Sequence, residues 1–301
     1  MIDMIPSDHV MAFKPLAGGA VLNTAIGIGR QSVDVGLVSG VSTDLFGDFL
    51  VKTLQDSAVD VSYLIRSDRP TTLAFVTLAS GHASYAFYDE NTAGRMVLPD
   101  DMPQELSNEI DALFFGGISL AVEPCADAYV AFLDKNKASR LVMVDANIRR
   151  SFINDEPRYR ARMAKVFANC DILKISDEDL QWISPTNQPR DKKALEILNQ
   201  GPELLCLTLG AKGVEVYDKN GLRFFCPAPR TTVADTIGAG DAFNAGLLVS
   251  IKRLHALSTS AVLALSQNDL ETAVRFATAF ASDTTTRQGS DPAWNFKSSK
   301  I

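Results

Sequence analysis

The feature that most constrains the fold of this chain is the alternation, after about residue 100, of short apolar runs with helix-length segments. The runs are DALFFGG (111–117), RLVMVDAN (140–147), CDILKIS (170–176) and LLCLTLG (204–210). Stretches such as YRARMAKVFANC and DKKALEILNQG separate them and have the length of helices. This alternation predicts an α/β fold with a central, mostly parallel sheet flanked by helices. Ligands bind beyond the carboxyl ends of such strands, so we expect the functional site there.

The first hundred residues follow a different pattern. Residues 71–90 alternate apolar and polar side chains on both sides of Ser80-Gly81, which predicts a hairpin with one solvated face. Together with 9–16 and 59–65, this segment predicts a small antiparallel sheet that acts as a lid. No internal repeat, low-complexity tract or linker interrupts the sequence, so we expect one domain over 1–301.

Composition narrows the class of protein. The 301 residues are 46% hydrophobic and 22% charged, which is ordinary for a globular protein. The net charge of −7 and the lack of a basic cluster argue against a nucleic-acid partner. No apolar run reaches the ~18 residues that span a bilayer, so we expect no membrane partner. The four cysteines form no C-x-x-C pair, which predicts reduced thiols in a cytoplasmic protein rather than disulfides or a zinc site.

The stretch ADTIGAGDAFNAGLLVSI (234–251) carries the most specific chemistry. Its glycines permit a tight turn with exposed N–H groups, and the apolar spacing after Asp241 predicts a helix. A helix N-terminus attracts anions and stabilises charge on a phosphoryl group in transit. A carboxylate at this position repels a bound phosphate, so its presence requires a functional reason. Asp241 fits a general base that accepts a proton from an attacking hydroxyl, and the alternative is that it simply caps the helix.

This segment closely resembles the signature D-T-x-G-A-G-D-x-F of the ribokinase-type (PfkB) carbohydrate kinase family. A second signature of that family, a Gly-Gly pair followed by Asn and a helix, is similar to AGGAVLNTAIGIGR (17–30). Further similarity in STDLFGDFL, VDANIR, DILKISDEDL, LTLGAKGVEVY and TTTRQGSDPAW extends over nearly the whole chain. IDMIP, TTLAFVTL and YAFYDENTAGRM are most similar to the fructokinase branch. The resemblance implies a ribokinase-like fold and ATP-dependent phosphorylation of a sugar's primary hydroxyl, with fructose as the leading candidate for the sugar.

The resemblance also implies roles for individual residues. Asp241 matches the catalytic base, and Gly238, Ala239 and Gly240 match the anion hole. Asp3, Gly19 and Asn23 match positions that hold sugar hydroxyls, and Arg149 is suited to neutralising phosphate charge. The positions that match the nucleotide site are Lys174, Ser176, Thr208, Gly210, Gly213 and Thr278, the last beside the adenine.

Two cation sites follow from the same resemblance. The family places Mg²⁺, which accompanies ATP, near an N-x-x-E motif that reads Ser176 to Asp179 here, so we expect a water-mediated contact from Asp179. Many members also bind a monovalent cation such as K⁺ beside the anion hole. The residues that match this second site are Asp235, Ile237, Thr284, Arg287 and Gly289, while Ala293 lacks the side-chain oxygen of some relatives.

The resemblance further predicts that the natural protein is longer at its start. Relatives begin with a strand several residues before the aspartate that matches Asp3, and little precedes Asp3 here. A missing internal strand would leave its neighbours with unpaired backbone groups, at about 1–3 kcal/mol for each buried one.

Several alternatives remain at this point. The nearest is a kinase for another sugar or for a sugar acid such as 2-keto-3-deoxygluconate, whose carboxylate Arg95 is suited to bind. A non-catalytic sugar-binding regulator is the rival from another class. Ser32 stands where a dinucleotide-binding fingerprint requires a third glycine or alanine, which argues against a Rossmann dehydrogenase. No Walker P-loop motif is present, and Ala121 replaces the last glycine of the G-x-S-x-G motif of hydrolases. By analogy with lids that pack against each other in relatives, we expect a homodimer.

Overall fold

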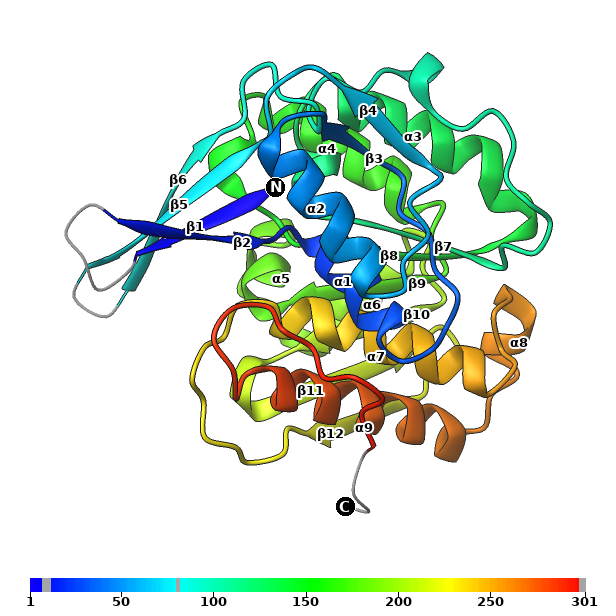
Figure 1. The fold of residues 1–301 in the computed structure, drawn as a ribbon. Helices are drawn as coiled ribbons and strands as arrows, with labels where there is room; N and C mark the ends of the chain where they lie inside the picture. Colours follow the sequence, from blue (N-terminus) through cyan, green and yellow to red (C-terminus); the bar gives the residue numbers. More distant parts are fainter. Residues whose placement is uncertain (7–11, 80–81, 298–301) are drawn as a thin grey trace.

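The computed structural model describes residues 1–6, 12–79 and 82–297. Its larger sheet has six strands in the order β12-β11-β10-β9-β8-β7 (Figure 1). Strands β7 to β10 pair in parallel, whereas β10, β11 and β12 pair antiparallel. The strands are β7 (Ala112–Gly116), β8 (Leu141–Asp145), β9 (Ile172–Ser176), β10 (Leu204–Thr208), β11 (Gly213–Asp218) and β12 (Arg223–Pro227). The predicted fold class is confirmed, and the four apolar runs form β7, β8, β9 and β10.

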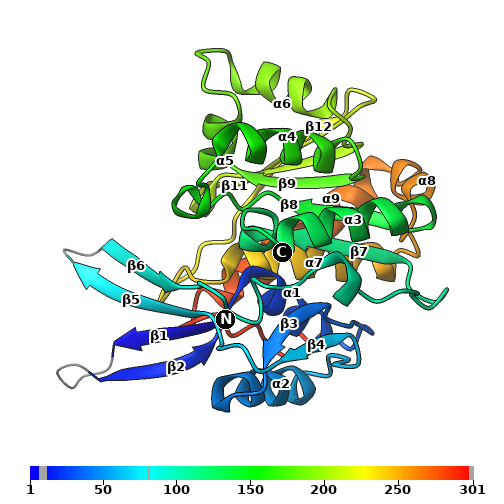
Figure 2. The same cartoon turned by 90° about the horizontal axis from the view of Figure 1, so that it is seen from above.

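Helices cover both faces of this sheet because its strands alternate apolar side chains between two cores. Val142 and Val144 of β8 face one core, and Leu141 and Met143 face the other. The first core includes α3 (Cys125–Asn136), α4 (Glu156–Phe167), α5 (Asp177–Ile183) and α6 (Arg190–Leu198). The second includes α7 (Ala239–Arg253), α8 (Thr259–Leu263) and α9 (Gln267–Thr284). Figure 2 shows the sheet between these helices.

A four-stranded sheet in the order β2-β1-β5-β6 projects from the body (Figures 1 and 2). It contains β1 (Ile2–Pro6), β2 (Phe13–Ala17), β5 (Leu73–Ala79) and β6 (His82–Tyr88). Phe75 packs edge to face against Phe13 and Tyr88, with ring centroids 5.0 and 5.5 Å away. The hairpin predicted over 71–90 is present as β5 and β6, although its Ser80-Gly81 turn and residues 9–11 of another predicted strand lie outside the described residues.

The prediction that 59–65 joins this lid is wrong. That stretch leads into β4 (Leu64–Ser67), which pairs in parallel with β3 (Ser39–Ser42) in a separate two-stranded sheet. Val59 is buried with α1 (Ala20–Gly29) and α2 (Leu45–Asp56) in a third core. The remaining lid strand is instead β1, because an alternating pattern predicts a strand but does not identify its partner.

Candidate active site

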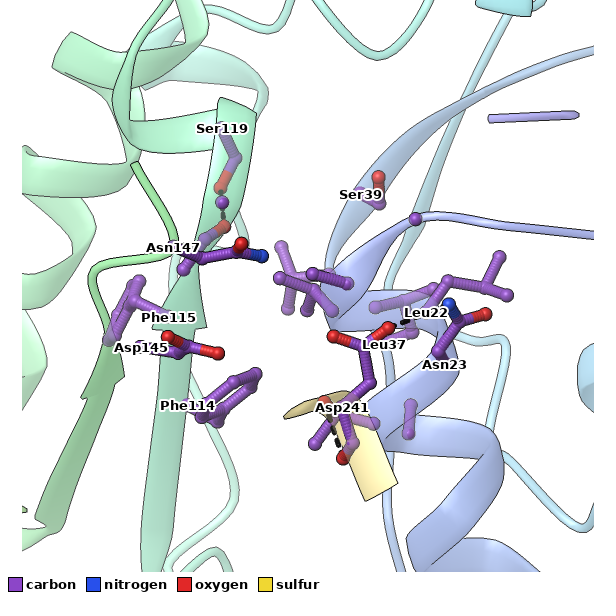
Figure 3. A pocket seen from close by; sticks show the side chains of 18 of the residues that line it. Leu22, Asn23, Leu37, Ser39, Phe114, Phe115, Ser119, Asp145, Asn147 and Asp241 are labelled. Carbon is purple, nitrogen blue, oxygen red and sulfur yellow. Dashed lines mark hydrogen bonds between the residues drawn. The ribbon is translucent and has the colours of Figure 1, made fainter. Parts of the chain in front are cut away.

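A cavity of about 1430 Å³ lies where the lid, α1, β3, β7 and the start of α7 meet. Residues at the carboxyl ends of three parallel strands line it, namely Asp145, Ser176 and Thr208. Figure 3 shows Asp145 and Asn147 on one wall, facing Asn23 and Asp241 on the other. The cavity thus lies at the sheet edge where the strand pattern predicted a ligand site.

The glycine turn forms the N-terminus of α7. Gly238 has the left-handed φ of 78° that favours glycine, and the helix starts at Ala239. A Cβ on Gly238 would lie 2.1 Å from Oγ of Ser290, so the turn also packs too tightly for a larger residue. Gly238 and Gly240 line the cavity with Asp241. The turn therefore directs the positive end of a fifteen-residue helix at the cavity.

Asp241 does not cap α7. The N-cap is Gly238, and Asp241 is the third residue of the helix. Oδ2 of Asp241 instead accepts a 2.8 Å hydrogen bond from Nδ2 of Asn23 in α1. Burial raises the pKa of Asp241 to about 6, while the Asn23 bond acts in the opposite direction. A carboxylate that titrates near neutral pH is suited to accept a proton, so the capping alternative is wrong.

A buried polar cluster joins the wall that faces Asp241 to α7. Nζ of Lys174 is 3.0 Å from Oδ2 of Asp145, and Nδ2 of Asn244 donates to the same oxygen over 2.7 Å. Burial alone would lower the pKa of Lys174, but Asp145 and other carboxylates raise it overall. An ideal Cβ on Gly240 would lie 3.1 Å from this ammonium. Lys174 therefore lies under the glycine turn as a charged group.

Sequence reasoning missed Asp145 and Asn244. Two signals were available, since Asp145 ends a predicted strand and Asn244 follows Asp241 by three residues on one helix face. Neither signal identifies Lys174 as the common partner, because β8, β9 and α7 are distant in sequence.

The residues predicted to hold sugar come from the lid, from the start of α1 and from the loop after β8. Asp3 is on β1, where burial raises its pKa, and Gly19 is the N-cap of α1 with a φ of 111°. Oδ1 of Asn23 is buried without a hydrogen-bond partner among the described residues. The exposed Arg149 also lines the cavity. The structure brings these four predicted residues to the same cavity as Asp241.

The residues predicted for the nucleotide divide into two groups. Lys174, Ser176, Thr208 and Gly210 line the cavity. Gly213 and Thr278 do not: a Cβ on Gly213 would lie 2.1 Å from the carbonyl of Cys226, and the buried Thr278 donates to the carbonyl of Val274 in its own helix. Their roles toward a nucleotide stay predictions.

Asp179, the predicted Mg²⁺ contact, already has backbone partners. Its two carboxylate oxygens accept from the N–H groups of Ile148 and Ser176, each over 2.9 Å, and it forms a capping box with Ser176 in α5. A carboxylate oxygen has two lone pairs, so these bonds leave acceptor capacity for a metal-bound water. The position suits a water-mediated contact better than direct coordination.

The residues predicted for a monovalent cation come together from two distant segments. Asp235 accepts hydrogen bonds from the N–H groups of Ile237 and Gly289, over 3.0 and 2.9 Å. The N–H of Asp235 donates to the carbonyl of Thr285, next to Thr284. Arg287 follows in the same loop and pairs through its side chain with Asp283. The carboxylate of Asp235 and the loop around Gly289 thus lie together, and Ser290 of that loop packs against the turn at Gly238. Their role toward a monovalent cation stays a prediction.

The chain is similar to known proteins over nearly its whole length. The model of the family described as "pfkB family carbohydrate kinase" matches residues 4–295. A fructokinase from Rhizobium leguminosarum bv. trifolii is 43% identical over 273 residues, which cover 90% of this chain and 83% of that protein. Fructokinase-1 from rice, Oryza sativa subsp. japonica, is 29% identical over 97% of this chain and 91% of its own length.

Solved structures agree with these relatives. The structure of fructokinase with bound ATP from Xylella fastidiosa superimposes with a TM-score of 0.89 at 27% identity, covering 98% of this chain and 93% of that one. A fructokinase from Vibrio cholerae, in a form with fructose, ADP and calcium ion bound, gives a TM-score of 0.82 at 26% identity, covering 96% and 91%.

Proposed function

We propose, from the premise that the chain belongs to the pfkB family of carbohydrate kinases, that it transfers the γ-phosphoryl group of ATP to a primary hydroxyl of fructose. The observation that carries this proposal is the position of Asp241. Its carboxylate lies at the N-terminus of α7, held by Asn23, with a pKa raised to about 6 by burial. A proton acceptor and an anion-binding helix terminus in one place fit phosphoryl transfer to an alcohol.

In the proposed reaction the hydroxyl oxygen of the sugar attacks the γ-phosphorus in line. A new P–O bond forms to the sugar, the bond from that phosphorus to the bridging oxygen breaks, and ADP leaves. Asp241 accepts the hydroxyl proton as the oxygen approaches phosphorus. The N–H groups at Gly238 and Gly240 would stabilise the charge that develops on the transferred group. The N–H of Ala239, the third residue predicted for the anion hole, donates to the carbonyl of Thr236 in this structure, and Ala239 does not line the cavity.

The residues proposed for the sugar support a polyol substrate. Asp3 and Asn23 present oxygen acceptors, and the unpaired Oδ1 of Asn23 would gain a hydroxyl donor on binding. Gly19 leaves room for close approach of the ring. The lid strands β1, β2, β5 and β6 would exclude water that otherwise competes as acceptor.

The nucleotide would lie along Ser176, Thr208 and Gly210, with Arg149 near its phosphates. Gly213 and Thr278 would not contact the nucleotide directly. They would support its site by shaping the loop after β10 and the helix α9. Mg²⁺, held through water by Asp179, would neutralise phosphate charge. K⁺ at Asp235, Ile237, Thr284, Arg287 and Gly289 would orient the dipoles of the glycine turn.

We also propose that the protein forms a homodimer through its lids and that it is cytoplasmic. The four buried free cysteines suit a reducing compartment.

A coupled ADP-release assay with Mg-ATP tests the proposal across fructose, ribose, glucose, adenosine and 2-keto-3-deoxygluconate. We expect turnover with fructose and a loss of at least ~10²-fold in Asp241→Asn. Asp100→Asn removes an exposed carboxylate outside the cavity and should retain full activity. Turnover with another sugar alone would contradict the choice of fructose, and no turnover with the panel would favour a non-catalytic sugar-binding protein.

The sugar-acid alternative depends on Arg95, and the geometry does not favour it. Arg95 lines the cavity, but its guanidinium lies 3.7 Å from the buried carboxylate of Asp89 and donates to the carbonyl of Glu123. Its charge is therefore already compensated within the protein.

A further inference from the structure

Asn147, in the loop after β8, has a backbone conformation that favours glycine. Its φ is 39°, and within the described part of the chain it shares a positive φ with two other asparagines, Asn91 and Asn295. Of these three asparagines, Asn147 alone lines the cavity. A strained backbone persists where the surrounding structure enforces it, and such positions are concentrated at functional sites. Asn147 is therefore a candidate for a functional role.

Neighbouring groups, rather than its own side chain, hold Asn147 in this conformation. The N–H of Ala146 donates to the carbonyl of Lys174 over 3.1 Å, and the N–H of Ile148 donates to Oδ1 of Asp179 over 2.9 Å. Asparagine often stabilises a turn through its side chain, but the amide of Asn147 has no hydrogen-bond partner among the described residues. The amide is thus available to a ligand in the cavity.

The amide lies beside the first turn of α1. Gly117, which follows β7 and has a φ of 71°, lies between them. An ideal Cβ on Gly117 would be 3.5 Å from Cβ of Ala20 and 3.7 Å from Nδ2 of Asn147. Ala20 follows Gly19, which is predicted to hold sugar, and Figure 3 shows Asn147 on the wall opposite Asp241. A sugar between Gly19 and the base would therefore be within reach of this amide.

The amide supplies hydrogen-bond donors that the other sugar-side groups lack. Asp3 and Asp241 are carboxylates, and the unpaired Oδ1 of Asn23 is also an acceptor. A sugar hydroxyl donates one proton but also accepts through two lone pairs, so it needs donors as well. Arg149, proposed for the phosphates, is charged, whereas the amide of Asn147 donates and accepts without adding charge. An amide therefore suits a neutral polyol.

We propose that Asn147 binds the acceptor sugar through non-reacting hydroxyl groups and holds its primary hydroxyl toward Asp241. Asn147 would thus be a further substrate-binding residue, on the wall opposite the base. This inference rests on the proposed function, because it requires a sugar in this cavity. Glycine at position 147 would relieve the backbone strain but would supply no side chain, which accounts for an asparagine there.

Asn147→Gly tests the proposal, because it removes the amide and suits the backbone conformation. The sugar is fructose, or the panel member that the native protein phosphorylates. We expect its KM to rise at least ~10-fold, since hydrogen bonds to the substrate are lost, while the KM for ATP changes less than about 2-fold. The variant should unfold in urea at the native midpoint or above it.

Asn91→Gly is the matched control. Asn91 has a φ of 56° and lies in an exposed turn outside the cavity, so the same substitution relieves similar strain without removing a cavity group. We expect this variant to keep the native KM for the sugar and for ATP.

Sugar binding without nucleotide, measured by calorimetry, separates contact from turnover. Deoxy analogues that each lack one non-reacting hydroxyl identify the group that Asn147 contacts. The analogue without that hydroxyl should bind the native protein and Asn147→Gly equally, because the contact is already absent. If every analogue loses affinity by the same factor in the variant, Asn147 contacts no hydroxyl and the proposal is overturned.

The kinetic outcomes also distinguish this inference from the proposed function. An unchanged sugar KM in Asn147→Gly would overturn the inference and leave the proposed function intact. A rise confined to the KM for ATP would also overturn it, because the amide would then contact the nucleotide. A lower unfolding midpoint would overturn it by showing that the side chain supports the fold. If the native protein phosphorylates no sugar of the panel, the proposed function fails, and this inference fails with it.

Discussion

Nδ2 of Asn23 donates a 2.8 Å hydrogen bond to Oδ2 of Asp241, and 218 residues separate the two in the sequence. The bond joins the first turn of α1 to the first turn of α7, each of which starts after a glycine with positive φ. It also fixes the direction of the carboxylate toward the cavity (Figure 3). The proposed base is thus oriented and partly tuned by one amide.

The pH dependence of activity should follow Asp241. The base must be ionised to accept a proton, so kcat/KM should fall as the pH drops through about 6. The hydrogen bond from Asn23 stabilises the ionised form of Asp241. Its removal in Asn23→Ala should therefore raise the pH at which kcat/KM falls, the acidic limb of the profile, by about one pH unit. The check is a pH–rate profile. Asn220→Ala, in the exposed turn after β11, should leave the limb in place; an unchanged limb in Asn23→Ala would show that the bond does not tune the base.

We expect Asp241→Asn to be more stable than the native protein at pH 7, although it should lose most of its activity. The pKa of Asp241 is higher in the folded state, at about 6, than its ordinary value of 3.8. The folded state therefore binds the proton more tightly, so the cost of the ionised group grows as the pH rises from about 4 to about 6 and is fully present above that. We expect a gain on the order of 1–3 kcal/mol at pH 7 that disappears as the pH falls to about 4. Urea unfolding at both pH values checks this, and a gain independent of pH would contradict it.

Gly238→Ala and Gly221→Ala form a matched pair. Both glycines have positive φ, 78° and 90°, so both substitutions impose a similar backbone cost of about 1–2 kcal/mol. A Cβ at 238 would also lie 2.1 Å from Oγ of Ser290, whereas one at 221 meets nothing within 4 Å. We expect Gly238→Ala to reduce kcat by at least ~10²-fold because the anion hole moves, and Gly221→Ala to retain it. Steady-state kinetics at saturating ATP separates them, and equal kcat values would mean that the turn has no catalytic role.

Breaking the buried pair of Lys174 and Asp145 should be costly. Lys174→Met leaves the carboxylate of Asp145, which is 1% exposed, without its counter-charge, and we expect a loss of about 3–5 kcal/mol in the free energy of unfolding. Lys52→Met breaks an exposed pair with Asp56 in α2 and should cost less than about 0.5 kcal/mol. Urea titrations of the two variants give the comparison. Similar losses would show that Lys174 is not held as a charged group.

The sequence by itself determined the elements and the local chemistry. Strands β7 to β10 follow from runs of apolar residues, because a strand buried on both faces requires them whatever its neighbours are. The glycine turn and Asp241 follow from a single short stretch, since turn, helix start and carboxylate lie within a few residues of one another.

Only the tertiary structure decided which elements are neighbours. It placed β1 rather than 59–65 in the lid, joined Asn23 to Asp241, and gathered Asp145, Lys174 and Asn244 from β8, β9 and α7. These pairings connect segments far apart in the chain. The local sequence pattern of a strand or helix is compatible with many different neighbours, so it does not identify the one that is used. The choice among them is made by packing the whole core at once, so the catalytic candidate was readable from the sequence, whereas the groups that hold and tune it were not.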